Sequence, residues 1–191
     1  ATLGERKCEM GQVGCRGYCS RDVLVDVYVP DEPRVTYEKV KPEMVKSILN
    51  DHIVGGKVFK KAASKDNYYD TLKMQTRVVL EHGGVIDPES IDEYIRVGGY
   101  ESLKKVLTSM KPDGVIAEIK KSGLRGKGGG GFVTATKWEM AAKAPTDEKG
   151  TRYIMVNGDE GNPASYMDRS VMEGSPHQVI EGLLIGAYAI G

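Results

Sequence analysis

Six glycines fall within the nine positions from Gly123 to Gly131, and this run restricts what the surrounding chain can fold into. Glycine loses more conformational freedom on folding than other residues, so a dense run suits places where side chains would obstruct a ligand or where φ must be positive. A helix that begins directly after such a loop adds unpaired N–H groups and the positive end of its dipole, which favour a phosphate. Lys127 and Lys137 add positive charge. The run therefore predicts a ligand that lies against bare backbone.

The order of elements around this run separates it from two common nucleotide-binding loops. The GxGxxG pattern occurs in it, but a dinucleotide-binding turn requires a strand running into the loop. The preceding residues instead predict a helix that Pro112 opens and Gly123 ends. No Ser or Thr follows the lysine, as the ATP-binding P-loop would require. A flexible surface linker is the alternative interpretation, which the embedded Phe132 and Trp138 disfavour.

Length and charge limit the classes of function. The chain of 191 residues can bury one sizeable core or two small ones. Its 27 basic and 27 acidic residues argue against nucleic acid or an anionic membrane as the main partner. No apolar run approaches the length of a bilayer crossing and no signal-peptide core is present, so we expect a cytoplasmic location. The apolar run GLLIGAYAI needs partners, and we expect a piece of a longer protein or one subunit of a complex.

Three cysteines, Cys8, Cys15 and Cys19, lie within the first twenty residues. Clustered cysteines in a cytosolic protein are more often metal or redox ligands than disulfides. The sequence CRGYC places Cys15 and Cys19 in a tight turn, and soft thiolates select zinc or iron and sulfide. Such sites generally use four ligands. A further pair upstream, a degenerate site and incidental free thiols therefore all remain open.

The first half of the chain predicts a small β structure followed by a helix. The β-branched run Val23–Val29 predicts a strand, and residues 34–40 are its expected partner. Pro42 opens a helix through Ile48. Residues 55–71 have no consistent period and predict a linker across a domain boundary, after which residues 74–80 return to strand character.

The second half predicts helices with one further strand. Helices are expected over residues 88–95 and 101–110 and from Pro112, and then after the glycine run with Thr134 as its cap. Tyr153–Val156 is predicted to be a strand. Ligands gather at the carboxyl ends of strands in α/β folds, where this sequence places Asn157, Asp159 and Glu160. An ordinary polar turn is the alternative. His177 is expected to pack or cap rather than bind a ligand.

The combined motifs resemble a known family. In order, SGLRGKGGGGF, TKW, VNGDEGNP and MDRSVMEGSPHQVIEGLLIGAYAIG resemble the flavin-binding segment of the NADH-oxidising flavoprotein subunit of respiratory complex I. The upstream sequence IDPESIDEYIRVGGYESLKKVLTSM is similar to the stretch that precedes the flavin site in soluble relatives of this subunit. These are the β subunits of electron-bifurcating and NAD-linked hydrogenases, NAD-dependent formate dehydrogenases and large benzoyl-CoA reductase complexes of anaerobes. GCRGYC with VLVDVYV resembles the second half of a thioredoxin-like [2Fe-2S] ferredoxin domain.

The resemblance implies an α/β fold in three parts. Residues 1–54 would form the C-terminal half of the thioredoxin-like ferredoxin domain, residues 55–85 a linker, and residues 86–191 the N-terminal part of a Rossmann-like FMN- and NADH-binding domain. Later domains of the family, including a helical bundle that holds a [4Fe-4S] cluster, would lie beyond this sequence. Implied partners are other subunits of a redox complex, including a small [2Fe-2S] ferredoxin-like subunit and a cluster-bearing catalytic subunit.

The resemblance also implies the roles of individual residues. FMN would lie over the glycine loop with Lys137 beneath it, NADH would stack beside Phe132, and polar side chains of the VNGDEG run would hold the ribityl chain and ring. Cys15 and Cys19 match the second ligand pair of the [2Fe-2S] cluster. The implied cofactor-binding residues are Gly126, Lys127, Gly128, Gly129, Phe132, Lys137, Asn157, Asp159 and Glu160.

The implied function is that of a diaphorase subunit, which passes electrons from NADH through FMN to iron–sulfur clusters. Two positions on the nicotinamide side depart from the family, Met140 for an aromatic residue and Asn162 for an acidic one. They leave open a flavin relay that no longer binds NADH. A cofactor-free scaffold subunit is a third hypothesis.

Overall fold

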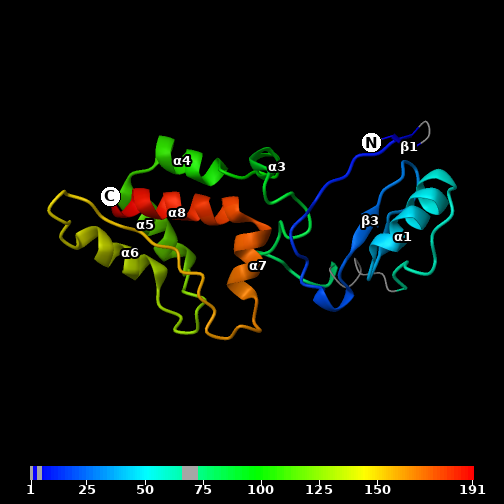
Figure 1. Ribbon diagram of the computed structural model, residues 1–191. Coiled ribbons are helices and arrows are strands. Elements are labelled where there is room, and N and C mark those ends of the chain that lie inside the picture. Colours follow the sequence, from blue (N-terminus) through cyan, green and yellow to red (C-terminus); the bar gives the residue numbers. More distant parts are fainter. Residues whose placement is uncertain (1, 4–5, 66–72) are drawn as a thin grey trace.

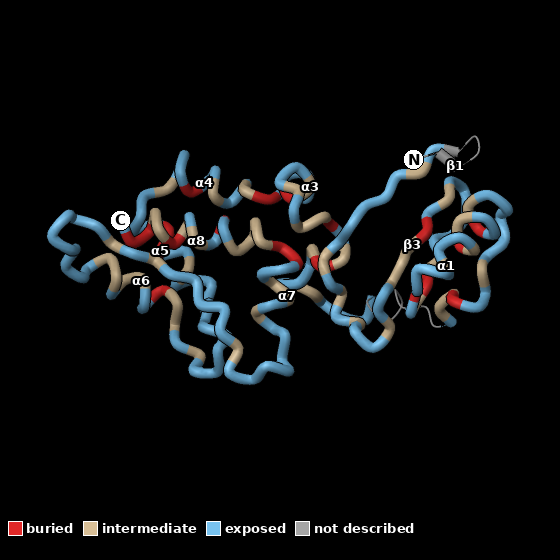
Figure 2. Tube along the Cα trace, in the orientation of Figure 1, coloured by how far each residue is buried: buried red, intermediate tan, exposed pale blue. Residues whose placement is uncertain are grey.

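The computed structural model describes residues 2–3, 6–65 and 73–191, and the chain forms two separate groups of packed elements. Figure 1 shows a small mixed lobe at the N-terminal end and a larger group of helices at the C-terminal end. Buried residues gather in two places, one within each group (Figure 2). We call residues 23–65 the N-terminal lobe, residues 8–22 the cysteine loop and residues 91–191 the helical part.

A short antiparallel hairpin forms the sheet of the N-terminal lobe. Strand β3 (Val25–Val27) pairs with β4 (Val35–Tyr37), with Val25 opposite Tyr37 and Val27 opposite Val35. The predicted strand pair is confirmed, although each strand is shorter than its β-branched run. A second pair, β1 (Thr2–Leu3) and β2 (Arg6–Lys7), lies at the N-terminal end.

The helix predicted from Pro42 packs on this hairpin. Helix α1 (Pro42–Ser47) has its proline in the first turn and continues directly into the π-helix η2 (Ile48–Val54). Val27, Tyr37, Val40, Ile48 and Ala62 form the buried core between helix and sheet. The fully buried Tyr37 hydroxyl lies 2.8 Å from Nδ1 of His52, and burial raises the pKa of Tyr37.

Residues 57–65 belong to the N-terminal lobe by their contacts, although the sequence predicted a linker from residue 55. The Phe59 N–H donates to the Tyr37 hydroxyl, and the Glu38 N–H donates to the Ala62 carbonyl. Ala62 is buried in the core and Ala63 bridges to Tyr37. The segment shows no hydrophobic periodicity because it is a loop that covers the edge of the hairpin. The remaining part of the predicted linker, residues 66–71, lies outside the described residues.

The strand predicted over residues 74–80 is wrong, because these residues form turns. The guanidinium of Arg77 donates to the carbonyls of Leu80 and Gly83, which closes the turns. Val78, Val79 and Leu80 remain partly exposed. A β-branched run becomes a strand only where another strand pairs with it, and none lies beside these residues in the part of the chain that the structure describes.

Six helices make up the helical part, and the last of them is its centre. Helix α8 (Pro176–Ile190) contacts α4 (Glu101–Ser109), α5 (Pro112–Ser122), α6 (Thr134–Lys143) and α7 (Met167–Gly174), as Figure 1 shows. Helix α3 (Ile91–Arg96) precedes α4, and the Ser90 hydroxyl caps it by accepting from the Glu93 N–H. The core between α8 and its neighbours consists of Val106, Val115, Ile116, Ala135 and Ala189.

Most helix boundaries follow the sequence signals, but the helix predicted from residue 88 begins only at Ile91, after the Ser90 cap. Pro112 lies in the first turn of α5, and Gly123 ends that helix in the left-handed conformation at φ 68°. Thr134 does not cap α6 as predicted, because it is already the first helical residue and Val133 occupies the cap position. The packing role expected for His177 is confirmed, since its ring stacks on Tyr94 and its Nδ1 lies 2.9 Å from the Tyr100 hydroxyl.

The strand predicted at Tyr153–Val156 is wrong, although the burial pattern of a strand is present. Arg152 and Ile154 face the helices while Tyr153 and Met155 are exposed, which is the alternation of a half-buried strand. Within the described residues 91–191 the only β pairing is the isolated bridge between Arg125 and Val133. The segment therefore lies along the helices without a partner strand (Figure 1).

Among the described residues, no helix is both long enough and apolar enough to cross a membrane.

Candidate functional site

The glycine loop between α5 and α6 is pinned at its base. The Gly126 N–H donates to the Phe132 carbonyl at 2.9 Å, and the Thr134 N–H donates to the Leu124 carbonyl at 3.0 Å. Across the loop, the Arg125 guanidinium donates to the Gly131 carbonyl at 3.1 Å. The base is thus a short hairpin, and the residues between Gly126 and Gly131 project from it.

No neighbouring atom explains the glycines at the tip of the loop. A Cβ added at Gly128, Gly129, Gly130 or Gly131 would meet nothing within 4 Å. Backbone conformation accounts for two of these positions, because φ is +103° at Gly129 and +59° at Gly131. Gly128 and Gly130 have neither a positive φ nor a close neighbour. Only a group that approaches the loop from outside the described chain would require glycine there.

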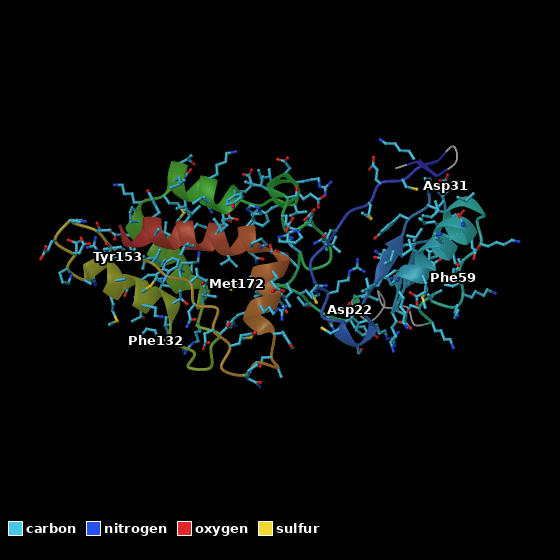
Figure 3. The ribbon with its side chains drawn as sticks, in the orientation of Figure 1. Asp22, Asp31, Phe59, Phe132, Tyr153 and Met172 are labelled. Carbon is cyan, nitrogen blue, oxygen red and sulfur yellow. The ribbon has the colours of Figure 1, made fainter. Side chains whose placement is uncertain are left out.

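The surroundings of the loop combine positive charge with an exposed aromatic ring. Lys127 lies in the loop and Lys137 in the first turn of α6, and both side chains are exposed. The Phe132 side chain is 55% exposed at the end of the loop (Figure 3). The Thr134 N–H is taken by the Leu124 carbonyl, but the next N–H groups in the first turn of α6 have no acceptors within the helix, so they add partial positive charge at the same place.

The second predicted group of ligands, residues 157–160, forms a polar turn between the extended segment and α7. The Asn157 side chain accepts from the Asp159 N–H at 2.8 Å. Glu160 accepts from the Asp168 N–H at 2.7 Å, so one of its carboxylate oxygens caps the first turn of α7. The Asp159 side chain forms no hydrogen bond or ion pair among the described residues and is exposed. Both carboxylate oxygens of Asp159 are therefore available to a ligand, whereas Asn157 and Glu160 each use a side-chain oxygen locally.

Packing against α7 fixes the position of this turn. A Cβ at Gly158 would overlap the sulfur of Met172, so the turn backbone lies directly on the α7 side chain. In Figure 1 the glycine loop and the connection from residue 157 to α7 project from the same edge of the helical part. The two predicted groups of flavin ligands therefore lie on one edge of the fold.

The cysteine loop carries the candidate metal ligands. Cys15 and Cys19 are exposed, and Cys19 begins the short 3₁₀ helix η1 (Cys19–Arg21). The neighbouring Cys15 thiolate, together with a hydrogen bond between the two sulfur groups, raises the pKa of Cys19. The three cysteines, all in the described part of the chain, form no disulfide.

Contacts on both sides position the cysteine loop. A Cβ at Gly14 would lie 2.7 Å from the Cα of Gly174, so bare backbone meets the end of α7. On the other side, the Arg16 guanidinium lies 2.8 Å from the Asp26 carboxylate of β3, and both side chains are largely buried. The loop is therefore held between the N-terminal lobe and the helical part.

Sequence reasoning missed two arginines that shape the candidate flavin site. Arg125 closes the glycine loop, as described above. Arg152 donates to the carbonyls of Ala142 and Ala144 at 3.0 and 3.1 Å, which caps the end of α6 and fixes the start of the extended segment. A pattern search based on glycines or carboxylates gives no signal for either arginine, because both act through backbone carbonyls.

The residues at this edge fit a flavin nucleotide. A Cβ at Gly128 or Gly130 would fill space that is open over the loop, and the lysines of the loop and of the first turn of α6 suit a phosphate. For an iron–sulfur cluster, the cysteine loop supplies two thiolates of the usual four. No group of three or more candidate metal ligands comes together within residues 2–3, 6–65 and 73–191.

Comparisons with known proteins agree with this assignment. Residues 119–191 match the family described as the Nuo51 FMN-binding domain. The chain is 52% identical over 121 residues to the NADP-reducing hydrogenase subunit HndC of Solidesulfovibrio fructosivorans, covering 63% of this chain and 24% of that protein. It is 44% identical over 114 residues to an F subunit of NADH-quinone oxidoreductase in Rhizobium meliloti, covering 60% of this chain and 26% of the relative.

A third relative, the F subunit of NADH-quinone oxidoreductase in Aquifex aeolicus, is 47% identical over 102 residues, or 53% of this chain and 23% of that protein. The chain thus spans about a quarter of the length of the curated relatives that it matches. The resemblance predicted from the motifs is confirmed: residues 119–191 match the Nuo51 FMN-binding domain, and the chain is similar to subunits of a hydrogenase and of NADH-quinone oxidoreductase.

Proposed function

We propose that this chain belongs to an FMN-containing subunit that oxidises NAD(P)H within a multi-subunit redox complex. The observation that carries the proposal is the tip of the glycine loop, where Gly128 and Gly130 have no internal reason to be glycine. These positions lie within the segment that matches the FMN-binding family. The relatives named as subunits of NADH-quinone oxidoreductase and of a hydrogenase support the redox role.

In this proposal the loop and the polar turn hold the cofactor. The backbone from Gly126 to Gly129 would lie under the flavin, and Lys127 and Lys137 would balance the phosphate charge. Asn157, Asp159 and Glu160 bind ribityl and ring atoms, with Glu160 also fixing α7. FMN held there would supply hydride acceptance and the release of single electrons, and these residues would orient it and set its potential. The exposed Phe132 offers a flat surface beside which the nicotinamide would lie.

The N-terminal residues extend the proposal to electron transfer. Residues 1–54 would be the C-terminal half of a thioredoxin-like domain, in which Cys15 and Cys19 provide two ligands of a [2Fe-2S] cluster. The described hairpin with α1 packed on it is compatible with that fold. Partner subunits would include a ferredoxin-like [2Fe-2S] protein and a cluster-bearing catalytic subunit, and the [4Fe-4S] cluster would lie in a further domain of the same protein.

One structural detail favours a second function, a flavin relay that does not bind the nicotinamide. Asn162 stands where the family pattern has an acidic residue, and its side chain accepts from the Ala164 N–H at 3.2 Å in a local turn. Met140, at the other departing position, is 63% exposed on α6. In this alternative the flavin exchanges electrons with protein partners alone.

The test is the anaerobic absorbance spectrum of the full-length, flavin-loaded protein before and after NADH or NADPH is added. Bleaching of the flavin band at stoichiometric nicotinamide supports the proposed oxidation. A flavin band that only dithionite or a reduced ferredoxin bleaches supports the relay. A colourless protein that takes up no added FMN overturns both and leaves the scaffold hypothesis.

A further inference from the structure

Charge is distributed unevenly along a chain that is neutral overall. Residues 39–65 contain seven of the 27 basic residues but only two of the 27 acidic ones, so this segment has five more positive than negative charges. The rest of the chain carries the compensating negative charge. Such an asymmetry creates a local positive potential even where the net charge is zero.

These lysines lie on one stretch of the chain, formed by residues 39–41, α1, η2 and residues 55–65. All seven are exposed: Lys39, Lys41, Lys46, Lys57, Lys60, Lys61 and Lys65. None of them forms an ion pair with any residue in the described part of the chain. Other lysines of the chain, including Lys104 and Lys120, do pair with neighbouring carboxylates. We call the exposed surface of this stretch the lysine face.

A hollow lies within the lysine face, at the carboxyl end of η2. It has a volume of about 420 Å³ and is open to solvent. Lys57 and Lys60 line it together with Val58, Phe59, Asn50 and Asp51. The Phe59 side chain lies on the N-terminal lobe away from the helices of the C-terminal part (Figure 3). Two ammonium groups beside apolar carbons suit the carboxylate side chain of another protein.

The lysine face adjoins the turn that contains Cys19. The Lys39 N–H donates to the Arg21 carbonyl at 2.9 Å, at the end of η1. The Arg21 guanidinium lies 2.8 Å from the Glu38 carboxylate and 3.4 Å from the Ser64 hydroxyl. Lys39 follows Glu38 in the sequence, and Lys65 follows Ser64. One end of the positive surface is therefore next to the candidate cluster ligands.

We propose that the lysine face docks an acidic electron-carrier protein beside the Cys15–Cys19 site. The docking rests on charge and shape, and only the redox character of the partner rests on the proposed function. Weak electron-transfer complexes bury small interfaces and gain their speed from complementary charge, which a face of flexible, unpaired lysines provides. The exposed Val45, Val54 and Val58 add short apolar contacts among the charges.

Other polyanions fit this face less well. Single-stranded nucleic acid is bound by rows of aromatic rings interleaved with cations, and within the described residues 39–65 Phe59 is the only Phe, Tyr or Trp. A membrane surface needs an amphipathic helix with a broad exposed apolar side, whereas Met44, Ile48 and Ile53 of α1 and η2 pack in the core of the N-terminal lobe. Glu43 and Asp51 lie among the lysines and would repel either polyanion, but acidic proteins carry lysines that can meet them.

The experiment measures association of the full-length, cofactor-loaded protein with an acidic plant-type [2Fe-2S] ferredoxin as probe, by stopped flow at several ionic strengths. The test variant is Lys60→Gln, Lys61→Gln and Lys65→Gln combined. The matched control replaces three exposed lysines on or beside the helices, as Lys105→Gln, Lys111→Gln and Lys121→Gln. We expect the association rate constant of the test variant to fall about tenfold at low salt and the control to stay within about twofold.

Three results would overturn the proposal. One is a loss of equal size in both triple variants, because the effect would then come from net charge alone. The second is the absence of any salt-dependent association of the unmodified protein with the ferredoxin. The third is tighter binding of the same face to duplex DNA or to vesicles containing phosphatidylserine. FMN content and nicotinamide-dependent bleaching, measured in the same preparations, report separately on the proposed function.

Discussion

The carboxylate of Glu181 on α8 accepts a hydrogen bond of 2.6 Å from the hydroxyl of Tyr94 on α3, 87 residues away along the chain. It also accepts from the Tyr100 and Leu103 N–H groups at 2.9 and 3.0 Å. These two N–H groups lie at the start of α4, so a side chain of α8 caps a neighbouring helix. Burial, and then the bond to Glu181, raises the pKa of Tyr94 well above its usual value, so Tyr94 stays a donor at alkaline pH.

We therefore expect Glu181→Gln to destabilise the helical part. The glutamine side chain has an NH₂ group where Glu181 has an oxygen, so at least one of the three donors that Glu181 binds loses its acceptor. A buried donor without an acceptor costs about 2 kcal/mol. Thermal unfolding of the full-length protein, followed by circular dichroism, measures the change. Glu118→Gln on the exposed side of α5 is the matched control. Equal stability of the two variants would contradict a capping role for Glu181.

Gly14→Ala is expected to separate the cysteine loop from α7. The new Cβ would lie 2.7 Å from the Gly174 Cα, and neither side of this contact has a flexible side chain that could move away. Such an overlap costs about 1–3 kcal/mol when the backbone must shift. Limited proteolysis of the folded protein should then cut the cysteine loop faster. Gly11→Ala serves as the control, since its Cβ meets nothing within 4 Å.

Gly128→Ala distinguishes a ligand requirement from a folding requirement. Nothing in the chain contacts the new methyl group and φ is not positive, so thermal stability without cofactor should stay unchanged. If the flavin lies on this backbone, the methyl group overlaps it and the dissociation constant of FMN rises about tenfold or more. Quenching of FMN fluorescence measures that constant. Gly182→Ala, an equally open position on α8, should leave it unchanged, and an unaltered constant in both variants would place FMN elsewhere.

Asp147 should make the turn after α6 sensitive to acid. Its carboxylate accepts from the Thr151 N–H at 2.7 Å, the Lys149 N–H at 2.9 Å and the Tyr153 hydroxyl at 3.0 Å, and these bonds hold its pKa below the usual range. Folding therefore favours the ionised form. The stabilisation is complete above the pKa of a free aspartate, about 4, and is lost as the pH falls through the lower pKa of the folded state.

The corresponding experiment compares wild type with Asp147→Ala from pH 7 to pH 2 by thermal unfolding. The difference in midpoint should be largest near neutral pH and disappear at the acid end. Because the carboxylate is exposed, we expect a small effect. A difference that persists unchanged at pH 2 would show that the alanine acts through the turn backbone rather than through the charge.

The sequence was informative where a signal is local. Pro42 and Pro112 opened their helices, Gly123 ended α5, and the two valine-rich runs paired as β3 and β4. Each of these features is decided by the residue's own backbone preference or by its near neighbours. The motifs of the flavin segment were confirmed within residues 119–191, where they form one ordered series.

Prediction failed where a partner decides the outcome. Residues 74–80 and Tyr153–Val156 both have the composition of strands, but no strand lies beside either of them in the described part of the chain. The role of Glu181 could not be foreseen, because its three donors come from a stretch about 80 residues earlier. Arg125 and Arg152 were missed because each binds backbone carbonyls, which any sequence provides.

The open glycines of the loop have an evolutionary consequence. Folding places no demand on Gly128 or Gly130, whereas the positive φ at Gly129 and Gly131 resists substitution whether or not anything is bound. A lineage that lost its cofactor would thus be free to acquire side chains at the first two positions while it kept the other two. The pattern of drift across these four residues would then record, in sequence alone, which descendants still carry a flavin.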